Sequence, residues 1–221
     1  MILSTVGATL GLVILASVGL SWLNGRTVQR VVDRTGKANF QLGLMRPGIF
    51  VHEALHALVG LMFGIKVTQF SLRPDAHSAA HVSFSYNRHS WWQRLGVAAA
   101  SVAPLWGIMT GLLLLGKRAW FPHVAWRALG EVKPVPDWPW ALAWLVAAVL
   151  LTFGASLSRQ DLRNTWVGLP LVIVLLMVVF GALQLLAPAA LIGWEQLNGM
   201  LFKVILAMAG IGLVINRLVG W

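Results

Sequence analysis

Long apolar runs separated by short polar stretches dominate this chain. A helix needs about 20 apolar residues to cross a bilayer, and several runs reach that length. The pattern predicts membrane helices over about 2–23, 94–115, 140–157, 165–186 and 197–218. A sixth apolar helix, over about 46–63, is short for a full crossing, so we expect it to span part of the membrane or to lie among other helices. The polar connector 24–45 is predicted to be a solvated loop or a short amphipathic surface helix.

After residue 64 the pattern changes from apolar runs to alternation. Residues 65–72 and 81–86 alternate between apolar and polar positions, and Arg73-Pro74-Asp75 forms a turn-like break between them. Two such runs predict a β-hairpin, and Gly64 is a natural end for the preceding helix. Because unpaired strand edges cannot face lipid, the hairpin is expected at the membrane interface or among the helices.

The composition supports an all-α membrane protein of about six transmembrane helices, with a small membrane-associated β-hairpin. Of the 221 residues, 58% are hydrophobic and 11% are charged, whereas a soluble domain carries about 25% charged residues. We therefore predict one multi-pass domain over 1–221, in a bacterial inner or plasma membrane. The net charge of +10 is better explained by anionic lipid headgroups than by nucleic acid. The absence of cysteine excludes disulfides and thiolate ligands.

Three titratable side chains interrupt the apolar helix 46–63. His52 and His56 are one helical turn apart, so they lie on one face and can hold one metal ion. Glu53 stands beside them, where it can act on a water held by the metal. This His-Glu-x-x-His pattern is the signature of zinc hydrolases. A charged side chain at mid-bilayer costs about 2.5–3.5 kcal/mol, which makes a chance match less frequent in such a segment.

A catalytic zinc usually has three protein ligands, so a third must come from elsewhere in the chain. Asp161 is the first candidate, because it lies at a junction between two membrane segments and a carboxylate suits zinc beside imidazole. It could equally cap the following helix or pair with Arg159 or Arg163. His77 and His81 are second candidates, although both lie in the strand-like region.

The sequence resembles the site-2-protease family of intramembrane zinc metalloproteases (the M50-type peptidases). Residues 51–67 are similar to that family's signature helix, which is followed by a Gly and strand-like residues. Residues 101–105 resemble its small-residue Ala-Gly-Pro helix start, and residues 158–161 its later segment with an Asp. The chain departs from the family's pattern at Ala103, Trp106, Gly107 and Leu162, and no PDZ insertion is present. These departures indicate a compact, divergent branch.

The resemblance implies a zinc endopeptidase that hydrolyses a membrane-embedded peptide or protein, with a catalytic core over about 46–187. One Zn²⁺ per chain would be held by His52, His56 and Asp161, and Glu53 would be the catalytic acid and base. A free edge of the hairpin could hold an extended substrate by strand addition. The residues expected near the substrate are Val67, Phe70, Val82 and Phe84.

Two other classes of function fit parts of the pattern. A non-catalytic membrane metalloprotein, or a pseudoprotease that binds client transmembrane segments, would keep the metal but has no need for Glu53. A transporter that uses the buried His and Glu as an ion relay would require further inward-facing charges, and these are scarce in the other apolar segments.

Overall fold

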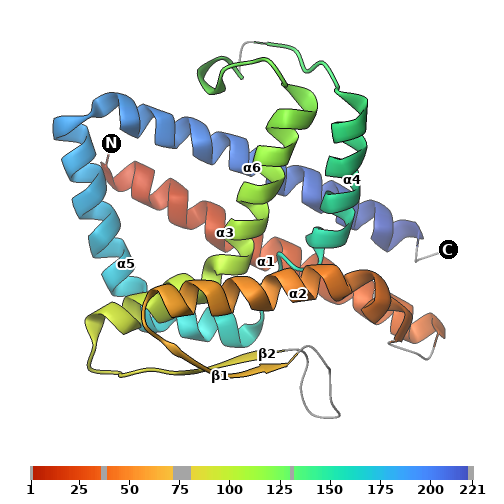
Figure 1. Ribbon diagram of the computed structural model, residues 1–221, viewed down its shortest axis with the longest axis horizontal. Helices are drawn as coiled ribbons and strands as arrows, with labels where there is room; N and C mark the ends of the chain where they lie inside the picture. The colour runs from red at the N-terminus through yellow and green to blue at the C-terminus, as the bar shows by residue number, and fades with distance from the viewer. Residues whose placement is uncertain (1, 36–38, 72–80, 130–131, 219–221) are drawn as a thin grey trace.

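The computed structural model describes residues 2–35, 39–71, 81–129 and 132–218. In this part of the chain six long helices, one antiparallel pair of strands and a short 3-10 helix follow one another. Their bounds are α1 Ile2–Thr35, α2 Asn39–Met62, β1 Lys66–Ser71, β2 His81–Ser85, α3 Trp91–Trp120, η1 Trp126–Ala128, α4 Trp138–Thr152, α5 Arg159–Leu186 and α6 Pro188–Leu218. The hairpin lies along α2 at one end of the molecule, and α3 and α4 extend away from it (Figure 1).

Four of these helices are long and apolar enough to cross a membrane, namely α1, α3, α5 and α6. Helix α5 is the least covered, since only 6% of its most apolar window is buried in the protein. Its apolar surface is therefore turned outward, as in a helix surrounded by lipid. Helix α4 has 15 residues, a length of about 22 Å, which is less than the hydrocarbon thickness. About six spanning helices were expected, and four of the described helices have the length and composition to span a membrane.

The predicted helix ends were wrong at several positions. Helix α1 does not end near residue 23 but continues to Thr35, in the polar connector, where Arg30 donates a 2.6 Å hydrogen bond to the side chain of Asn216 in α6. Asn216 in turn donates to Thr27 at 2.9 Å. These bonds to α6 stabilise the helical conformation of a polar segment. The pattern of apolar residues within that segment could not predict this helix. Helix α2 begins at Asn39 and includes Pro47, rather than opening at residue 46.

The hairpin is confirmed, with β1 and β2 antiparallel. Val67 pairs with Phe84 and Phe70 with Val82, while Thr68 forms a bulge. Because the bulge adds one residue, these four apolar side chains share a face of the sheet. The Phe84 ring packs directly over Gly60, so this face is turned toward α2.

Gly64 ends α2 as predicted. Its φ of +69° is a backbone conformation that glycine adopts without steric cost. The amide of Ile65 donates to the carbonyl of Gly60 at 3.0 Å, and the amide of Gly64 donates to Leu61 at 3.0 Å. This pair of bonds is the Schellman motif, which satisfies the last carbonyls of the helix and turns the chain toward β1.

The main core is built from α1, α3, α4 and α6, around Leu20, Leu105, Ile108, Leu112 and Met208. Beside it, α2 meets the turn after α4 by direct backbone contact between Gly48 and Gly154. A Cβ atom on Gly154 would overlap the backbone of Gly48. The close approach therefore depends on both positions having no side chain, and it places the turn next to the His52 segment.

We predict that Gly154→Ala lowers the free energy of unfolding by about 1–3 kcal/mol, because the added methyl group forces α2 and the turn apart. The matched control is Gly111→Ala in α3, where an added Cβ meets nothing within 4 Å. That change should be neutral or stabilising by up to about 1 kcal/mol. Thermal unfolding in detergent measures both variants. Equal midpoints for them would contradict the proposed backbone contact.

Candidate metal centre

His52 and His56 lie on the face of α2 that is covered by α3 and the turn after α4. Their Nε2 atoms are 2.9 Å apart. The Nδ1 of His52 is 2.7 Å from the carbonyl oxygen of Gly154, and the Nδ1 of His56 is 2.7 Å from the carbonyl oxygen of Ala100. A separate backbone oxygen therefore fixes the orientation of each ring.

These bonds also decide where the imidazole protons are. A carbonyl oxygen only accepts, so each Nδ1 must carry a hydrogen and donate it. In the neutral rings both Nε2 atoms then present lone pairs, and these lone pairs face each other across 2.9 Å. Such an arrangement is repulsive unless a cation or a proton lies between them. Donation from Nδ1 to an oxygen acceptor is also the usual support of a metal-binding histidine.

Asp161 completes the group from the first turn of α5. Its Oδ1 is 3.3 Å from Nε2 of His56 and its Oδ2 is 3.7 Å from Nε2 of His52. The side chains of His52, His56 and Asp161 are 12%, 6% and 13% exposed, so the site is shielded but not sealed. A carboxylate adds a third acceptor, and the convergence of three acceptors strengthens the case for a bound cation.

The two alternatives for Asp161, ligand or cap, prove to be compatible. Ser158 is the N-cap of α5, and Asp161 is the third residue of the helix. The backbone N–H of Ser158 donates to Oδ2 of Asp161 at 2.7 Å, and the amide of Asp161 donates to the Ser158 hydroxyl at 3.1 Å. This capping box fixes the carboxylate and leaves Oδ1 for a ligand. The ion-pair partners of Asp161 are the two histidines, rather than Arg159 or Arg163.

The spacing of the three ligand atoms fits a small divalent cation. Zinc bonds of about 2.0–2.2 Å in a tetrahedron place the ligand atoms about 3.3–3.6 Å apart. The separations of 2.9, 3.3 and 3.7 Å bracket these values. Among the described residues, this is the group of His, Asp and Glu side chains whose ligand atoms lie within 4.8 Å of one another. The geometry leaves a fourth position for water or substrate, and it is compatible with zinc without distinguishing it from other small cations.

Glu53 is buried, with 6% of its surface exposed, although it is not a member of the ligand group. Its carboxylate lies within electrostatic range of His52, His56, Asp161 and His81. A carboxylate in this place can exchange a proton with a water in the fourth position of the site. Its burial next to the cation site is the feature that a purely structural metal site would not need.

Of the two alternative ligands, His81 does not join the group. His81 begins β2, opposite Ser71, and lies near Glu53 rather than among the three ligand atoms. His77 lies outside the described residues. Of the positions expected to contact substrate, Val67, Val82 and Phe84 are partly covered, while Phe70 is 43% exposed.

Helix α1 holds the turn that carries the Gly154 carbonyl and leads to Asp161. The hydroxyl of Ser21 donates to the carbonyl of Leu157 at 2.8 Å. The amide of Asn24 lies 3.4 Å from the carbonyls of Thr152 and Phe153. Neither residue was singled out from the sequence. The sequence offered one indication of this role, because Ser21 and Asn24 are polar residues inside or just after the first apolar run. It offered none for the backbone carbonyls of Gly154 and Ala100.

Comparison of the chain with protein-family models, with curated proteins and with solved structures gives no match. The function must therefore be inferred from the chemistry of the candidate metal centre.

We predict that Asp161→Asn weakens metal binding by at least about tenfold, because an amide loses the charge and ligand strength of the carboxylate. The amide oxygen can still accept from Ser158, so the helix start is preserved. The matched variant is Ser158→Ala, which should lower helix stability by about 1 kcal/mol and retain the metal. Metal titration and thermal unfolding of both variants separate the ligand role from the capping role. Equal metal affinity in Asp161→Asn and wild type would contradict the assignment of this ligand.

We also predict that the double variant Ser21→Ala with Asn24→Leu weakens metal binding by up to about tenfold. Without these bonds, the turn after α4 no longer fixes the Gly154 carbonyl and Asp161. Loss of a residue that supports a metal ligand typically has an effect of this order. The control is Ser17→Ala, since the hydroxyl of Ser17 donates to the carbonyl of Val13 in its own helix at 2.6 Å. Cobalt substitution with an absorption spectrum reports the ligand geometry directly. An unchanged affinity and spectrum in the double variant would show that α1 does not position the site.

Proposed function

We propose that this protein is an intramembrane zinc-dependent endopeptidase. The observation that carries the proposal is the meeting of two imidazole Nε2 atoms and one carboxylate oxygen, next to the buried Glu53. The ligands come from α2 and α5, and four helices of the chain are long and apolar enough to span a membrane. The resemblance of residues 51–67, 101–105 and 158–161 to site-2 proteases supports the same reading.

In this proposal His52, His56 and Asp161 hold the metal in the orientation that the Gly154 and Ala100 carbonyls and the capping box impose. A bound Zn²⁺ supplies a Lewis acid that lowers the pKa of water and polarises a peptide carbonyl. Glu53 accepts the proton of the attacking water and passes it to the leaving amine. Burial of Glu53 favours this exchange, because a carboxylate poorly solvated by water is a stronger base.

The substrate in this proposal is a membrane-embedded protein segment that is extended where it is cut. Within the described chain the sheet has two strands, so each strand has an outer edge without a strand partner. An extended segment could pair with one of these edges through its backbone. The bulge at Thr68 interrupts the regular pattern of β1, which makes β2 the more regular edge for such pairing.

A non-catalytic metalloprotein is the rival proposal. It would explain the ligands and their carbonyl supports, but it gives no role to Glu53. Burying a carboxylate that is not a ligand is costly, and such residues in membrane segments are usually functional. The endopeptidase proposal gives this residue a defined task.

We predict that Glu53→Gln retains stoichiometric metal and lowers the cleavage rate by about 10²–10⁴-fold, which is the usual contribution of a general base. The protein is reconstituted in vesicles with a panel of single-span membrane proteins, and mass spectrometry detects new chain ends. Elemental analysis of the same samples reports the metal.

The control for this prediction is Glu195→Gln, which changes a carboxylate outside the site that accepts a 2.8 Å hydrogen bond from Thr5. This variant should cleave like wild type. Equal cleavage by Glu53→Gln and wild type, or wild type without stoichiometric metal, would overturn the proposed function.

A further inference from the structure

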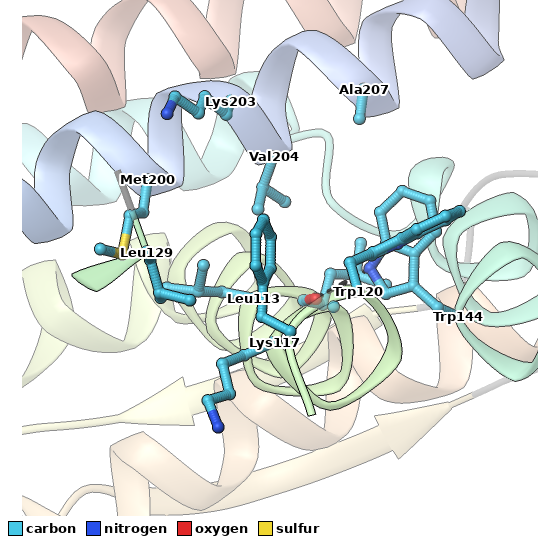
Figure 2. A pocket seen from close by; sticks show the side chains of 12 residues that line it. Leu113, Lys117, Trp120, Leu129, Trp144, Met200, Lys203, Val204 and Ala207 are labelled. Carbon is cyan, nitrogen blue, oxygen red and sulfur yellow. Dashed lines mark hydrogen bonds between the residues drawn. The ribbon is translucent and has the colours of Figure 1, made fainter. Parts of the chain in front are cut away.

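A second hollow in the protein lies away from the metal centre. It is a pocket of about 250 Å³ between the last turns of α3, the middle of α4 and the middle of α6, and we call it the α3–α6 pocket (Figure 2). Its α3 wall starts at Leu112, twelve residues beyond Ala100, whose carbonyl supports His56. Twelve helical residues correspond to about 18 Å, so the two sites do not share residues or space.

The walls of the α3–α6 pocket are mostly apolar and partly aromatic. Trp120 and Trp144 pack edge to face with ring centroids 6.1 Å apart. The indole N–H of Trp144 donates to the Leu112 carbonyl at 2.9 Å, which fixes this wall. Met200 and Val204 of α6 form part of the opposite side. The volume is below the roughly 300–1,000 Å³ of ordinary small-molecule sites, and it suits one narrow chain better than a ring system.

Two lysines flank this apolar surface. Lys117 comes from α3 and Lys203 from α6; they extend from opposite walls of the pocket, and their amino groups point away from each other (Figure 2). Lys203 stands in the middle of an apolar helix and is exposed. Among the described residues, neither lysine has a carboxylate within 4.0 Å, whereas the neighbouring Arg118 is paired with Asp137 at 2.7 Å. The pocket therefore combines an apolar interior with two cations that lack an anion from the described chain.

We propose that the α3–α6 pocket binds an anionic phospholipid, with one acyl chain against Trp144 and Val204 and the phosphate headgroup beside one of the two lysines, Lys117 or Lys203. Lysine stems pack along apolar surface while their ammonium groups reach the headgroup level. Basic pockets between membrane helices are suited to acidic headgroups, and tryptophan prefers the same interfacial depth. This inference depends on the chain spanning a membrane but not on the presence of zinc or on catalysis.

The experiment uses the full-length protein in phosphatidylcholine nanodiscs, with phosphatidylglycerol added as the anionic probe. Native mass spectrometry counts the bound lipid of each kind. Wild type should retain phosphatidylglycerol at least about tenfold more strongly than phosphatidylcholine, and the double variant Lys117→Gln with Lys203→Gln should lose this preference. Val204→Trp, which fills the pocket, should reduce retention of phosphatidylglycerol without changing the charge.

The matched control is Lys66→Gln with Lys133→Gln, which removes the same charge from β1 and from the loop before α4. It should retain the preference for phosphatidylglycerol. The proposal is overturned if the control loses as much as the Lys117 and Lys203 variant, or if wild type retains both lipids equally. It is also overturned if millimolar inorganic phosphate displaces the bound lipid completely, because the site would then recognise a free anion. Metal content and cleavage should not change in the Lys117 and Lys203 variant or in Val204→Trp, so failure here would leave the proposed function untouched.

Discussion

Three ligand atoms that each carry a lone pair converge at one point inside this protein, and much of the structure around them is needed to keep them there. The two imidazole rings cannot rotate to avoid each other, because the Gly154 and Ala100 carbonyls each hold one Nδ1 hydrogen. Those carbonyls come from the turn after α4 and from α3, so α2 must lie tightly between them. The backbone contact between Gly48 and Gly154 makes that fit possible.

The surrounding helices turn this local arrangement into a membrane-compatible one. Helix α1 contacts α6 along much of its length and fixes the turn after α4 through Ser21. Helix α3 contacts both α2 and α5, which supply the three ligand atoms. The polar groups of the site are therefore shielded by helices whose outer faces are apolar. They do not contact lipid, where an unsatisfied polar group would be costly.

The sequence predicted the chemistry of the site better than the limits of its helices. His52, Glu53 and His56 could be found because their spacing on a helix has a direct geometric meaning, and Asp161 could be named as a candidate because it is an acidic residue at a junction between two membrane segments. The convergence of α5 on α2 could not be predicted, since it depends on packing between distant segments. Likewise, the extension of α1 to Thr35 depends on Asn216, nearly two hundred residues away. Backbone acceptors such as the Gly154 carbonyl could not be predicted either, because every residue has a carbonyl group and the type of side chain does not identify it.

The capping box orders part of the candidate metal centre before any ion arrives. The backbone N–H of Ser158 holds the Asp161 carboxylate, and the Ser158 hydroxyl accepts from the Asp161 amide, so neither bond needs a cation. The carbonyls of Gly154 and Ala100 hold the two histidines in the same way, without a cation. The site is thus preorganised, and an arriving ion does not have to order a loop or start a helix. In small zinc-folded domains the metal is part of the folding free energy. Here a metal ion at the candidate centre would be bound and released while α5 keeps its first turn.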